Sequence, residues 1–495
     1  MKDLVAVLQH KNMYGILQYA VQAYGDLPAI TNCGENQPDH SYRELLQQVQ
    51  QLAAELQAHS GKIIPQKECT NKDKVGKVQY HYVLCARNSY NWIVSFFAII
   101  CSGDVVIPLD ADITDSELAE ALSSVDADIL ITDRKFDCIS IKQCTLQKFI
   151  QSGSEIHLKY EYRPTTDENK PSVFLMTSGV TSAPKYVMLS QRNLIYSTLN
   201  GLDAVPLESG KRVLSVLPPH HSYEISCGLL YHICLGSHIY VNDKKINFIN
   251  NLKKVKPQCI AAVPSIVYAL IALMKGEQAA RKKSCVETIE IIYCGGAAVD
   301  SSAIGLLKSN GVMVLQGYGM TECAPAITFN RIDDFTVNTV GKPLRFVQIQ
   351  IKGKELYVKA PNVMIGYYKN PIATAEILQN DWLQTGDVGY FDSEGHLILC
   401  GRVKNIIVLN TGENVYPEEL EERIFQKDQR IKYCKVYEDK GSVSVQIFSD
   451  VHSKEDINRI ISDVNNEVSS FKRIQKIYIL EAMPKVTALG KPYRR

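Results

Sequence analysis

Short apolar runs alternate with amphipathic stretches over most of this 495-residue chain. The apolar runs predict buried strands, and the amphipathic stretches predict helices. The expected strands are Tyr80–Leu84, Asp128–Thr132, Val173–Met176, Arg212–Leu217, Cys259–Val263, Ile289–Tyr293 and Val312–Leu315. The expected helices are Tyr42–Leu56, Asp115–Ser124, Val299–Lys308 and the segment after Ser190. Strand and helix in alternation predict an α/β fold with mostly parallel, helix-covered sheets.

The pattern changes twice toward the C-terminal end. After Val347 the stretch VQIQIKGKELYVKA alternates with period two, which predicts an antiparallel β subdomain at about residues 340–400. Beyond Gly401 the expected elements are a helix from Pro417, a strand pair around Val436 and Val443–Phe448, a helix at Glu455–Val468 and a strand at Lys476–Leu480. We therefore predict a large N-terminal domain, residues 1–400, and a small α+β C-terminal domain, residues 401–495.

Composition and charge change this picture little. Hydrophobic residues make up 45% and charged residues 22% of the chain, and the net charge of +1 gives no reason to expect nucleic acid as a partner. The apolar segment Trp92–Cys101 is about half a membrane span, so we expect a buried helix and no transmembrane segment. The start MKDLVAVLQHKN lacks the features of a secretion signal. The 14 cysteines form no CxxC pair, and we expect reduced thiols in a cytoplasmic protein.

The segment TSGVTSAPK, Thr177–Lys185, directly follows an expected strand and combines a glycine, hydroxyls and a lysine. Glycine lets the backbone approach phosphate oxygens, hydroxyl and N–H groups donate hydrogen bonds, and lysine adds positive charge. The spacing differs from the Gly-Lys-Ser/Thr nucleotide loop. A solvated polar loop is the alternative interpretation. The candidate phosphate-binding residues are Thr177, Ser178, Gly179, Thr181, Ser182 and Lys185.

Further clusters carry candidate chemistry. They offer an aromatic ring and bare backbone for a flat base, a carboxylate for a hard cation, and polar groups for ribose hydroxyls. The clusters are QGYGMTE with Tyr318, Thr321 and Glu322, YCGGAA from Tyr293 to Ala298, TGD with Asp387, Arg402, and Lys491 in a glycine-flanked basic tail. For the tail lysine, a solvated ammonium is the alternative interpretation.

Taken together, these motifs resemble those of the adenylate-forming superfamily, which includes acyl-CoA synthetases and the adenylation domains of nonribosomal peptide synthesis. The family's loop reads TSGTTGxPKG, and this chain has TSGVTSAPKY. The other matching motifs, in family order, are QGYGMTE, VGKPL, ELYVKAPNVMIGYY, WLQTGDVGY, GRVKNIIVLNTGENVYPEELE and PKVTALGKPYRR. The resemblance extends from about Tyr42 to the last residue.

The resemblance implies a reaction in two steps. A substrate carboxylate attacks the α-phosphate of ATP to give an acyl-adenylate and pyrophosphate, and a thiol then attacks the acyl carbon and releases AMP. By the same resemblance the loop holds the β- and γ-phosphates. The implied catalytic residues are Lys491, Thr321 and the Mg²⁺ ligand Glu322. The implied adenine- and ribose-binding residues are Gly295, Gly296, Ala297, Tyr318, Gly319, Asp387 and Arg402.

The family also rotates its C-terminal domain between the two steps. The matching hinge residue is Lys404, within residues 402–405, and without the resemblance it would be interpreted as a surface linker lysine. The rotation would withdraw Lys491 from the site and bring Gly412 to the tunnel for the thiol. Asn405, beside the hinge, stands where the family usually has an acid.

The phosphate loop departs from the family at Val180, Ser182 and Tyr186. Valine removes one hydroxyl, and serine and tyrosine restrict backbone angles that glycine leaves free. We expect weaker ATP binding or a stiffer loop. A non-catalytic homologue that only binds a nucleotide or an acyl group is an alternative.

The stretch PPHHSYEIS, Pro218–Ser226, carries no aspartate to pair with the ammonium of an amino acid, and a buried unpaired ammonium is costly. The pattern from His221 to Glu224 resembles that of fatty acyl ligases, in which this histidine lies beside the acyl pocket. A histidine that caps the next helix is the alternative. The candidate acyl-pocket residues are His221, Val263 and Gly317, whose missing side chain leaves room, with Cys227, Leu229 and Leu230 as further wall residues.

We therefore expect a ligase that uses ATP and Mg²⁺ to activate a medium- or long-chain fatty acid. The acceptor would be the thiol of CoA or of phosphopantetheine on a separate carrier protein. An adenylation enzyme for an aryl or amino acid is the second interpretation.

Overall fold

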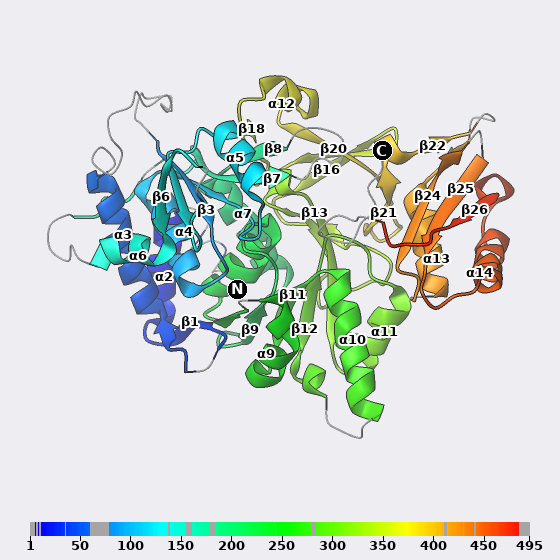
Figure 1. Ribbon diagram of the computed structural model, residues 1–495, viewed down its shortest axis with the longest axis horizontal. Helices are drawn as coiled ribbons and strands as arrows, with labels where there is room; N and C mark the ends of the chain where they lie inside the picture. Colours follow the sequence, from blue (N-terminus) through cyan, green and yellow to red (C-terminus); the bar gives the residue numbers. More distant parts are fainter. Residues whose placement is uncertain are drawn as a thin grey trace.

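The computed structural model describes residues 5, 8, 11–34, 36–59, 79–136, 139–154, 161–165, 167–177, 184–242, 244–279, 284–409, 413–428, 430–439 and 442–484. Two large sheets with their helices form the main body of the protein (Figure 1). A smaller lobe, orange and red at the right of Figure 1, follows at the C-terminal end. The predicted α/β class is confirmed.

The first sheet has seven strands in the order β18-β8-β7-β4-β3-β5-β6. The strands from β7 to β6 run parallel, and β8 and β18 extend one edge in antiparallel pairing. Their bounds are β3 (His81–Cys85), β4 (Val105–Pro108), β5 (Ile129–Thr132), β6 (Lys142–Thr145), β7 (Pro171–Thr177), β8 (Lys185–Ser190) and β18 (Gly366–Tyr367). The strand β8 was not predicted, because the expected phosphate loop and helix stood directly beside it in the sequence.

The second sheet has nine strands in the order β15-β14-β13-β12-β11-β9-β10-β1-β2. The strands from β13 to β1 run parallel, and antiparallel strands close both edges. Their bounds are β1 (Pro28–Asn32), β2 (Asp39–Ser41), β9 (Arg212–Ser215), β10 (His238–Val241), β11 (Cys259–Ala262), β12 (Ile291–Cys294), β13 (Met313–Gly319), β14 (Ala326–Phe329) and β15 (Lys342–Pro343). The carboxyl ends of the parallel strands lie at one edge, where α/β sheets bind ligands.

Helices cover the faces of both sheets (Figure 1). Their bounds are α2 (Met13–Tyr24), α3 (Tyr42–His59), α4 (Tyr90–Ser102), α5 (Asp115–Ser124), α6 (Leu146–Ser154), α7 (Gln191–Ala204), α8 (Tyr231–Cys234), α9 (Phe248–Val255), α10 (Pro264–Ala279), α11 (Ser301–Ser309) and α12 (Pro371–Ile377). A π-helix, η1 (Glu224–Leu230), leads into α8. The apolar segment around residues 92–101 forms α4, and all residues of that helix except Asn91 are buried. In the part of the chain that the structure describes, no helix has the length and apolar character needed to cross a membrane.

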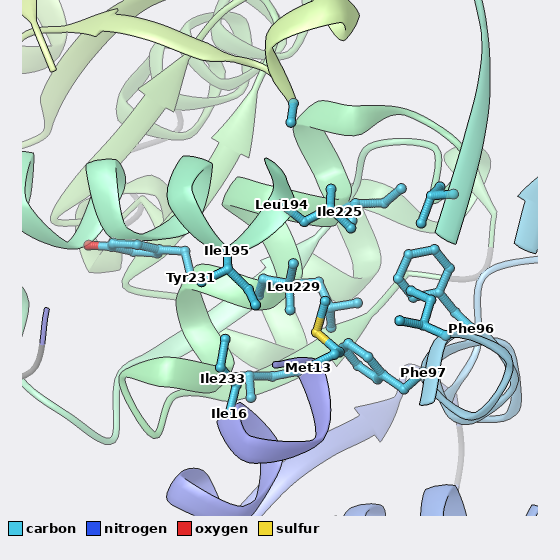
Figure 2. Close-up of a cluster of buried hydrophobic side chains, with 14 of the residues drawn as sticks. Met13, Ile16, Phe96, Phe97, Leu194, Ile195, Ile225, Leu229, Tyr231 and Ile233 are labelled. Atoms are coloured by element: carbon cyan, nitrogen blue, oxygen red, sulfur yellow. The ribbon is translucent and has the colours of Figure 1, made fainter. Parts of the chain in front are cut away.

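The largest hydrophobic core lies where helices from distant parts of the chain meet (Figure 2). In Figure 2, Met13 from α2, Phe97 from α4, Ile195 from α7 and Leu229 from η1 point toward one another. Leu229 and Leu230, predicted as acyl-pocket wall residues, are both buried in this core. Full burial of such side chains contributes about 1.5–3 kcal/mol each, so this packing fixes η1 against the sheets.

An antiparallel subdomain follows the second sheet, as the period-two pattern predicts. It comprises β16 (Gln348–Lys352), β17 (Glu355–Lys359), β19 (Leu378–Gln379), β20 (Trp382–Phe391) and β21 (Leu397–Arg402). A buried imidazole joins this subdomain to the loop before it: His396 Nε2 lies 2.8 Å from Asp334 Oδ1, and its Nδ1 lies 3.2 Å from Asp392 Oδ2. The last strand, β21, ends at Arg402 in the candidate site.

The C-terminal lobe has a hydrophobic core of its own. It contains β22 (Ile407–Val408), β23 (Asn414–Val415), α13 (Pro417–Lys427), β24 (Tyr433–Asp439), β25 (Ser442–Phe448), α14 (Lys454–Asn466) and β26 (Lys476–Ile479). The strands β24 and β25 pair antiparallel, and β26 joins β25 in parallel. The order of helices and strands agrees with the predicted α+β pattern.

A cluster of polar side chains lies at the surface of this lobe. The carboxylate of Asp428 accepts hydrogen bonds from Arg430 at 2.6 Å and His452 at 2.8 Å. Ser449 Oγ lies 2.6 Å from the other ring nitrogen of His452. The hydrogen bonds from Arg430, with a smaller contribution from His452, hold the pKa of Asp428 well below its usual value. A carboxyl with a lowered pKa in the folded state stabilises the fold above its unfolded pKa of about 3.9 and loses that contribution as the pH falls.

Replacing the central carboxylate, Asp428→Asn, should therefore lower the free energy of unfolding of this lobe at pH 7 by about 1–3 kcal/mol. Between pH 5 and pH 3, the range in which the carboxyl of the unfolded state titrates, the variant should also lose less stability than the wild type. Urea unfolding at the two pH values measures both effects. Asp450→Asn is the matched control, because its pair with Lys432 is about half exposed and contributes little. Equal changes in the two variants would contradict the role given to the cluster.

Candidate functional site

The segment that links β13 to β14 forms a tight turn at the edge of the nine-stranded sheet. The backbone N–H of Met320 donates to Pro325 O at 3.0 Å, and a 3₁₀ turn, η4 (Thr321–Cys323), lies between them. A side chain at Gly319 would place its Cβ 2.1 Å from Pro325 O, so only glycine fits this approach. The turn carries the predicted residues Thr321 and Glu322, and Glu322 is buried.

Hydrogen bonds join three of the predicted nucleotide-binding residues. Tyr318 Oη donates to Asp387 Oδ2 at 2.7 Å, and Arg402 Nε donates to Asp387 Oδ1 at 2.7 Å. Asp387 and Arg402 are paired residues on the neighbouring strands β20 and β21. The hydroxyl of Thr385 accepts from the backbone N–H of Asp387 at 3.0 Å and fixes the turn of the strand there. The sequence prediction that these residues meet is therefore consistent with the structure.

A tyrosine without a predicted role links two further site residues. Tyr367 Oη donates to Glu322 Oε1 at 2.7 Å, and Lys185 Nζ lies 4.9 Å from the centroid of the same ring. Burial, and then the negative charge of Glu322, raise the pKa of Tyr367, so its hydroxyl keeps its proton and donates. Thr177 and Lys185 are paired residues of the β7–β8 hairpin, and Thr177 Oγ1 donates to Lys185 O at 3.2 Å.

Lysine and arginine side chains lie near the carboxylates of Glu322 and Asp387. Partial burial, and then the charge of Arg402, hold the pKa of the Lys404 ammonium below its usual value, and Lys185 acts in the same direction. Lys404 lies in a 3₁₀ turn, η5 (Val403–Asn405), immediately after Arg402. Three cations near two carboxylates suit a polyanionic ligand together with a cation.

The predicted adenine wall lies beside Tyr318. The end of β12 pairs with β13, with Cys294 opposite Gln316, so the glycines that follow β12 lie next to Tyr318 and its neighbours. Gly296 has φ +85°, which favours glycine, and both Gly296 and Ala297 are exposed. Gly295 is buried. This surface has the bare backbone that a planar base requires.

Aromatic rings lie against one glycine of the predicted adenine wall and one glycine of the predicted acyl pocket. A side chain at Gly295 would place its Cβ 3.3 Å from the ring of Tyr223, and one at Gly317 would meet the ring of Phe329 at 2.2 Å. The room that we expected beside Gly317 is thus taken by Phe329 in this structure. Val263 is half-buried after β11.

His221 lies in the turn that opens this segment. Its backbone N–H donates to Pro218 O at 3.1 Å, and its carbonyl accepts from Ile225 N at 3.1 Å. The rings of His220 and His221 lie 4.4 Å apart. The histidine backbone therefore starts the helix, as the capping interpretation requires, and the side chain is half-buried.

The one carboxyl of the segment Pro218–Ser226 is held by hydrogen bonds within the protein. Glu224 is buried, and it accepts hydrogen bonds from Ser215 Oγ and the backbone N–H of Leu217. Burial outweighs these hydrogen bonds and raises the pKa of Glu224 to about 7. A side chain at Gly228 would place its Cβ 2.4 Å from Glu224 Oε2, so the carboxyl packs against the next turn of η1. It shares a small cavity with Asn88, which donates to Ser215 at 3.0 Å.

Several predicted residues lie outside the described part of the chain. They are Ser178, Gly179, Val180, Thr181 and Ser182 of the phosphate loop, Gly412 and Lys491. Their roles stay predictions. The third departure in the loop, Tyr186, is described: it lies in β8 opposite Met176, with its side chain buried in the core. Because Tyr186 lies in a strand, this position does not need the extra backbone freedom of glycine.

The site fits a magnesium ion by its chemistry. Glu322 supplies a buried carboxylate and Thr321 a neighbouring hydroxyl, and Mg²⁺ prefers oxygen ligands. A magnesium ion that also binds substrate phosphates needs only one or two protein carboxylates. Bound there, the ion would neutralise phosphate charge.

Sequence reasoning did not identify Tyr367, Tyr223 or Phe329 as parts of the site. Tyr367 stands in the matching motif ELYVKAPNVMIGYY, which was the only available signal. Nothing in the sequence shows which ring fills the space beside a glycine.

Comparisons with known proteins agree on one family. A family model described as AMP-binding enzyme matches residues 17–368. The chain is 26% identical to a long-chain-fatty-acid–CoA ligase of Escherichia coli O6:H1 over 84% of its length and 81% of the relative. It is also 26% identical to a 2-succinylbenzoate–CoA ligase of Oceanobacillus iheyensis, over 84% of the chain and 89% of the relative. It spans 58% of the length of the probable acyl-activating enzyme 16, chloroplastic, of Arabidopsis thaliana, at 26% identity over 66% of this chain.

Solved structures share the fold. The O-succinylbenzoate CoA synthetase of Bacillus subtilis in complex with AMP superposes with a TM-score of 0.79 at 21% identity, over 96% of each chain. The anthranilate CoA ligase AuaEII in complex with anthranoyl-AMP superposes with a TM-score of 0.82 at 17% identity, over 98% of this chain and 96% of the other.

Replacing the shared acceptor, Asp387→Asn, should weaken AMP binding about tenfold or more, because Tyr318 and Arg402 both lose a charged partner. Isothermal titration calorimetry with AMP measures the change. Asp381→Asn is the matched control in the same subdomain, since its side chain is 82% exposed and its carboxylate pairs with the surface lysine Lys359 at 3.0 Å. An unchanged affinity in the first variant would remove Asp387 from the nucleotide site.

Proposed function

We propose, from the premise that the chain belongs to the AMP-binding enzyme family, that it is an ATP-dependent, AMP-forming ligase that joins a carboxylic acid to a thiol. The observation that carries this proposal is the meeting of Glu322, Asp387, Arg402, Lys185 and Lys404 at one edge of the sheets. These groups come from four separate segments, and together they suit a nucleotide with a bound cation.

The first step brings a carboxylate anion against a polyphosphate. Cations placed beforehand where negative charge develops lower the barrier of such a reaction. Lys185 would attract the outer phosphates, and Asp387 with Arg402 would hold the ribose. We assign the contact with both the carboxylate and the α-phosphate to Lys491, on the resemblance of its motif. Magnesium at Glu322 would be needed for the same charge reason.

The acid is proposed to carry no ammonium group near its carboxylate. Within Pro218–Ser226 the one acidic residue is Glu224, and it is turned to Ser215 and packed against Gly228. An amino acid would bring an ammonium with no carboxylate from this segment to pair with, and such burial is costly. This argument supports a fatty or an aryl acid over an amino acid.

A medium- or long-chain fatty acid is the first candidate substrate. The apolar side chain of Val263 supports it, as does the similarity to a long-chain-fatty-acid–CoA ligase. An aryl acid is the second candidate, and the observation that favours it is the pair of rings, Tyr223 and Phe329, against Gly295 and Gly317. Rings at these two positions shorten the space and suit a flat acyl group.

The thiol acceptor is proposed to be CoA or carrier-bound phosphopantetheine, which present the same arm. For the second step, the C-terminal lobe would rotate about Lys404 and bring Gly412 to the tunnel for the thiol. The separate core of the lobe supports motion as one body.

ATP–pyrophosphate exchange against a panel of short to long fatty acids, aryl acids and amino acids tests the first step without any thiol. We expect exchange that depends on Mg²⁺ and peaks at one fatty-acid length. Lys491→Ala should reduce the rate by about 10²–10³, the usual effect of removing one preorganised donor. A peak with an aryl acid would transfer the assignment to the second candidate. Silence with every acid, with ATP binding intact, would favour a non-catalytic homologue.

Phe329→Ala should move the preferred acid toward longer or bulkier members of the panel, because the ring fills the space beside Gly317. Gly317→Ala should act in the opposite sense, since its Cβ would push the ring farther into the pocket. The kcat/KM ratio between two acid lengths measures both effects. If neither ratio changes while both variants stay folded, Phe329 lies outside the acyl pocket.

A further inference from the structure

One tyrosine ring contacts both halves of the proposed polyphosphate site. Tyr367, on the two-residue strand β18, donates its hydroxyl to Glu322 Oε1 at 2.7 Å. The ammonium of Lys185, on β8, lies 4.9 Å from the centroid of the ring. The tyrosine is only 7% exposed, so both contacts are shielded from water. A buried residue that touches a carboxylate through its hydroxyl and a cation through its ring orders the two groups relative to each other.

The backbone around this ring is tied down on several sides. Tyr367 pairs with Val187 on β8, and its N–H donates to Thr374 Oγ1 at 2.9 Å. Three residues earlier, the N–H of Met364 donates to the carbonyl of Glu322 at 2.8 Å. The segment that carries the tyrosine is therefore bonded both to the strand of Lys185 and to the turn of Glu322. These backbone hydrogen bonds fix the main chain from which the ring of Tyr367 extends to both partners.

The two contacts have different physical consequences. A hydrogen bond to one carboxylate oxygen fixes the plane of the carboxylate and leaves lone pairs on it for a cation. The face of an aromatic ring attracts an ammonium and limits the rotation of the long lysine side chain. Freed from the ring, Lys185 would have to be ordered by its ligand, which costs affinity.

We propose that Tyr367 is a positioning residue that sets Glu322 and Lys185 in one arrangement, so that a divalent cation and the outer phosphates of ATP bind together. The inference rests on the proposed function, which gives Glu322 its cation and Lys185 its phosphate. It adds a residue that affects the affinity for metal-bound ATP and does not act on the adenosine part of the nucleotide.

The adjacent tyrosine offers a matched control. Tyr368 also donates its hydroxyl to a carboxylate, Asp126 Oδ2, at 2.8 Å, but its ring packs on His81 and Phe174 in the first sheet. Tyr367→Phe and Tyr368→Phe therefore delete the same atom and the same kind of hydrogen bond. Any general loss of stability should be similar in the two variants, and thermal unfolding measures it.

Isothermal titration calorimetry with Mg²⁺-ATP, with ATP in EDTA and with AMP separates the contributions. Tyr367→Phe should weaken the binding of Mg²⁺-ATP about tenfold, the order expected for a hydrogen bond to a charged group, and change AMP binding less than about twofold. Tyr368→Phe should match the wild type with all three ligands. Tyr367→Leu, which also removes the ring, should in addition weaken ATP in EDTA, because Lys185 loses its support.

Equal affinities of the two phenylalanine variants for Mg²⁺-ATP would overturn the proposal, as would an equal loss for AMP and Mg²⁺-ATP in Tyr367→Phe. Unchanged metal-free ATP binding in Tyr367→Leu would overturn the part that concerns Lys185. These readouts need no acid and no thiol. A failure of the proposed ligase activity would appear in the exchange assay and leave this binding comparison interpretable.

Discussion

The hydrogen bonds that converge on Asp387 hold the site together. Tyr318 reaches this carboxylate from the nine-stranded sheet, and Arg402 reaches it from the end of β21. Asp387 is only 9% exposed, and its carboxylate needs such donors because burial without them would be costly. The same bonds that satisfy Asp387 thereby fix the antiparallel subdomain against the parallel sheet. The proposed nucleotide site lies at this junction, so its geometry depends directly on the packing of the two parts.

The parallel sheet supplies the other half of the arrangement. Pairing of Cys294 with Gln316 aligns the ends of β12 and β13, which brings the glycines after one strand beside the tyrosine of the other. A Cβ atom at Gly319 would lie 2.1 Å from Pro325 O, so glycine allows the chain to turn back here. This turn carries Glu322. The same edge receives Lys185 through β8 and β18, which extend the first sheet. The site is thus assembled where strand ends of two sheets meet, as the open α/β architecture favours.

The sequence predicts much of this arrangement and fails where contacts depend on distant residues. The apolar runs around residues 259–263 and 289–293 became β11 and β12 within about two residues, because burial in a parallel sheet demands continuous apolar sequence. The meeting of Tyr318, Asp387 and Arg402 followed from motif resemblance. Tyr367 could not be assigned, since its partner Glu322 lies 45 positions away and no local pattern links them. The sequence shows that Gly317 has no side chain, but it does not show that the ring of Phe329 fills the space beside it.

Hydrogen bonds on both sides of the proposed hinge limit where rotation can occur. Arg402 is held by Asp387 of the subdomain, and Asn405 Nδ2 donates to Glu418 Oε1 of α13 at 2.5 Å. Only Val403 and Lys404 stand between these two anchors. If both anchors persist during rotation, the backbone change must be absorbed by these two residues, and Lys404 is the residue that the resemblance assigns as the hinge. An acid at position 405, usual in the family, would face Glu418 with like charge, whereas the amide of Asn405 donates a hydrogen bond to it. The departure at this position therefore ties the end of the hinge to the C-terminal lobe, and it leaves the two residues before it as the part of the linker that can turn.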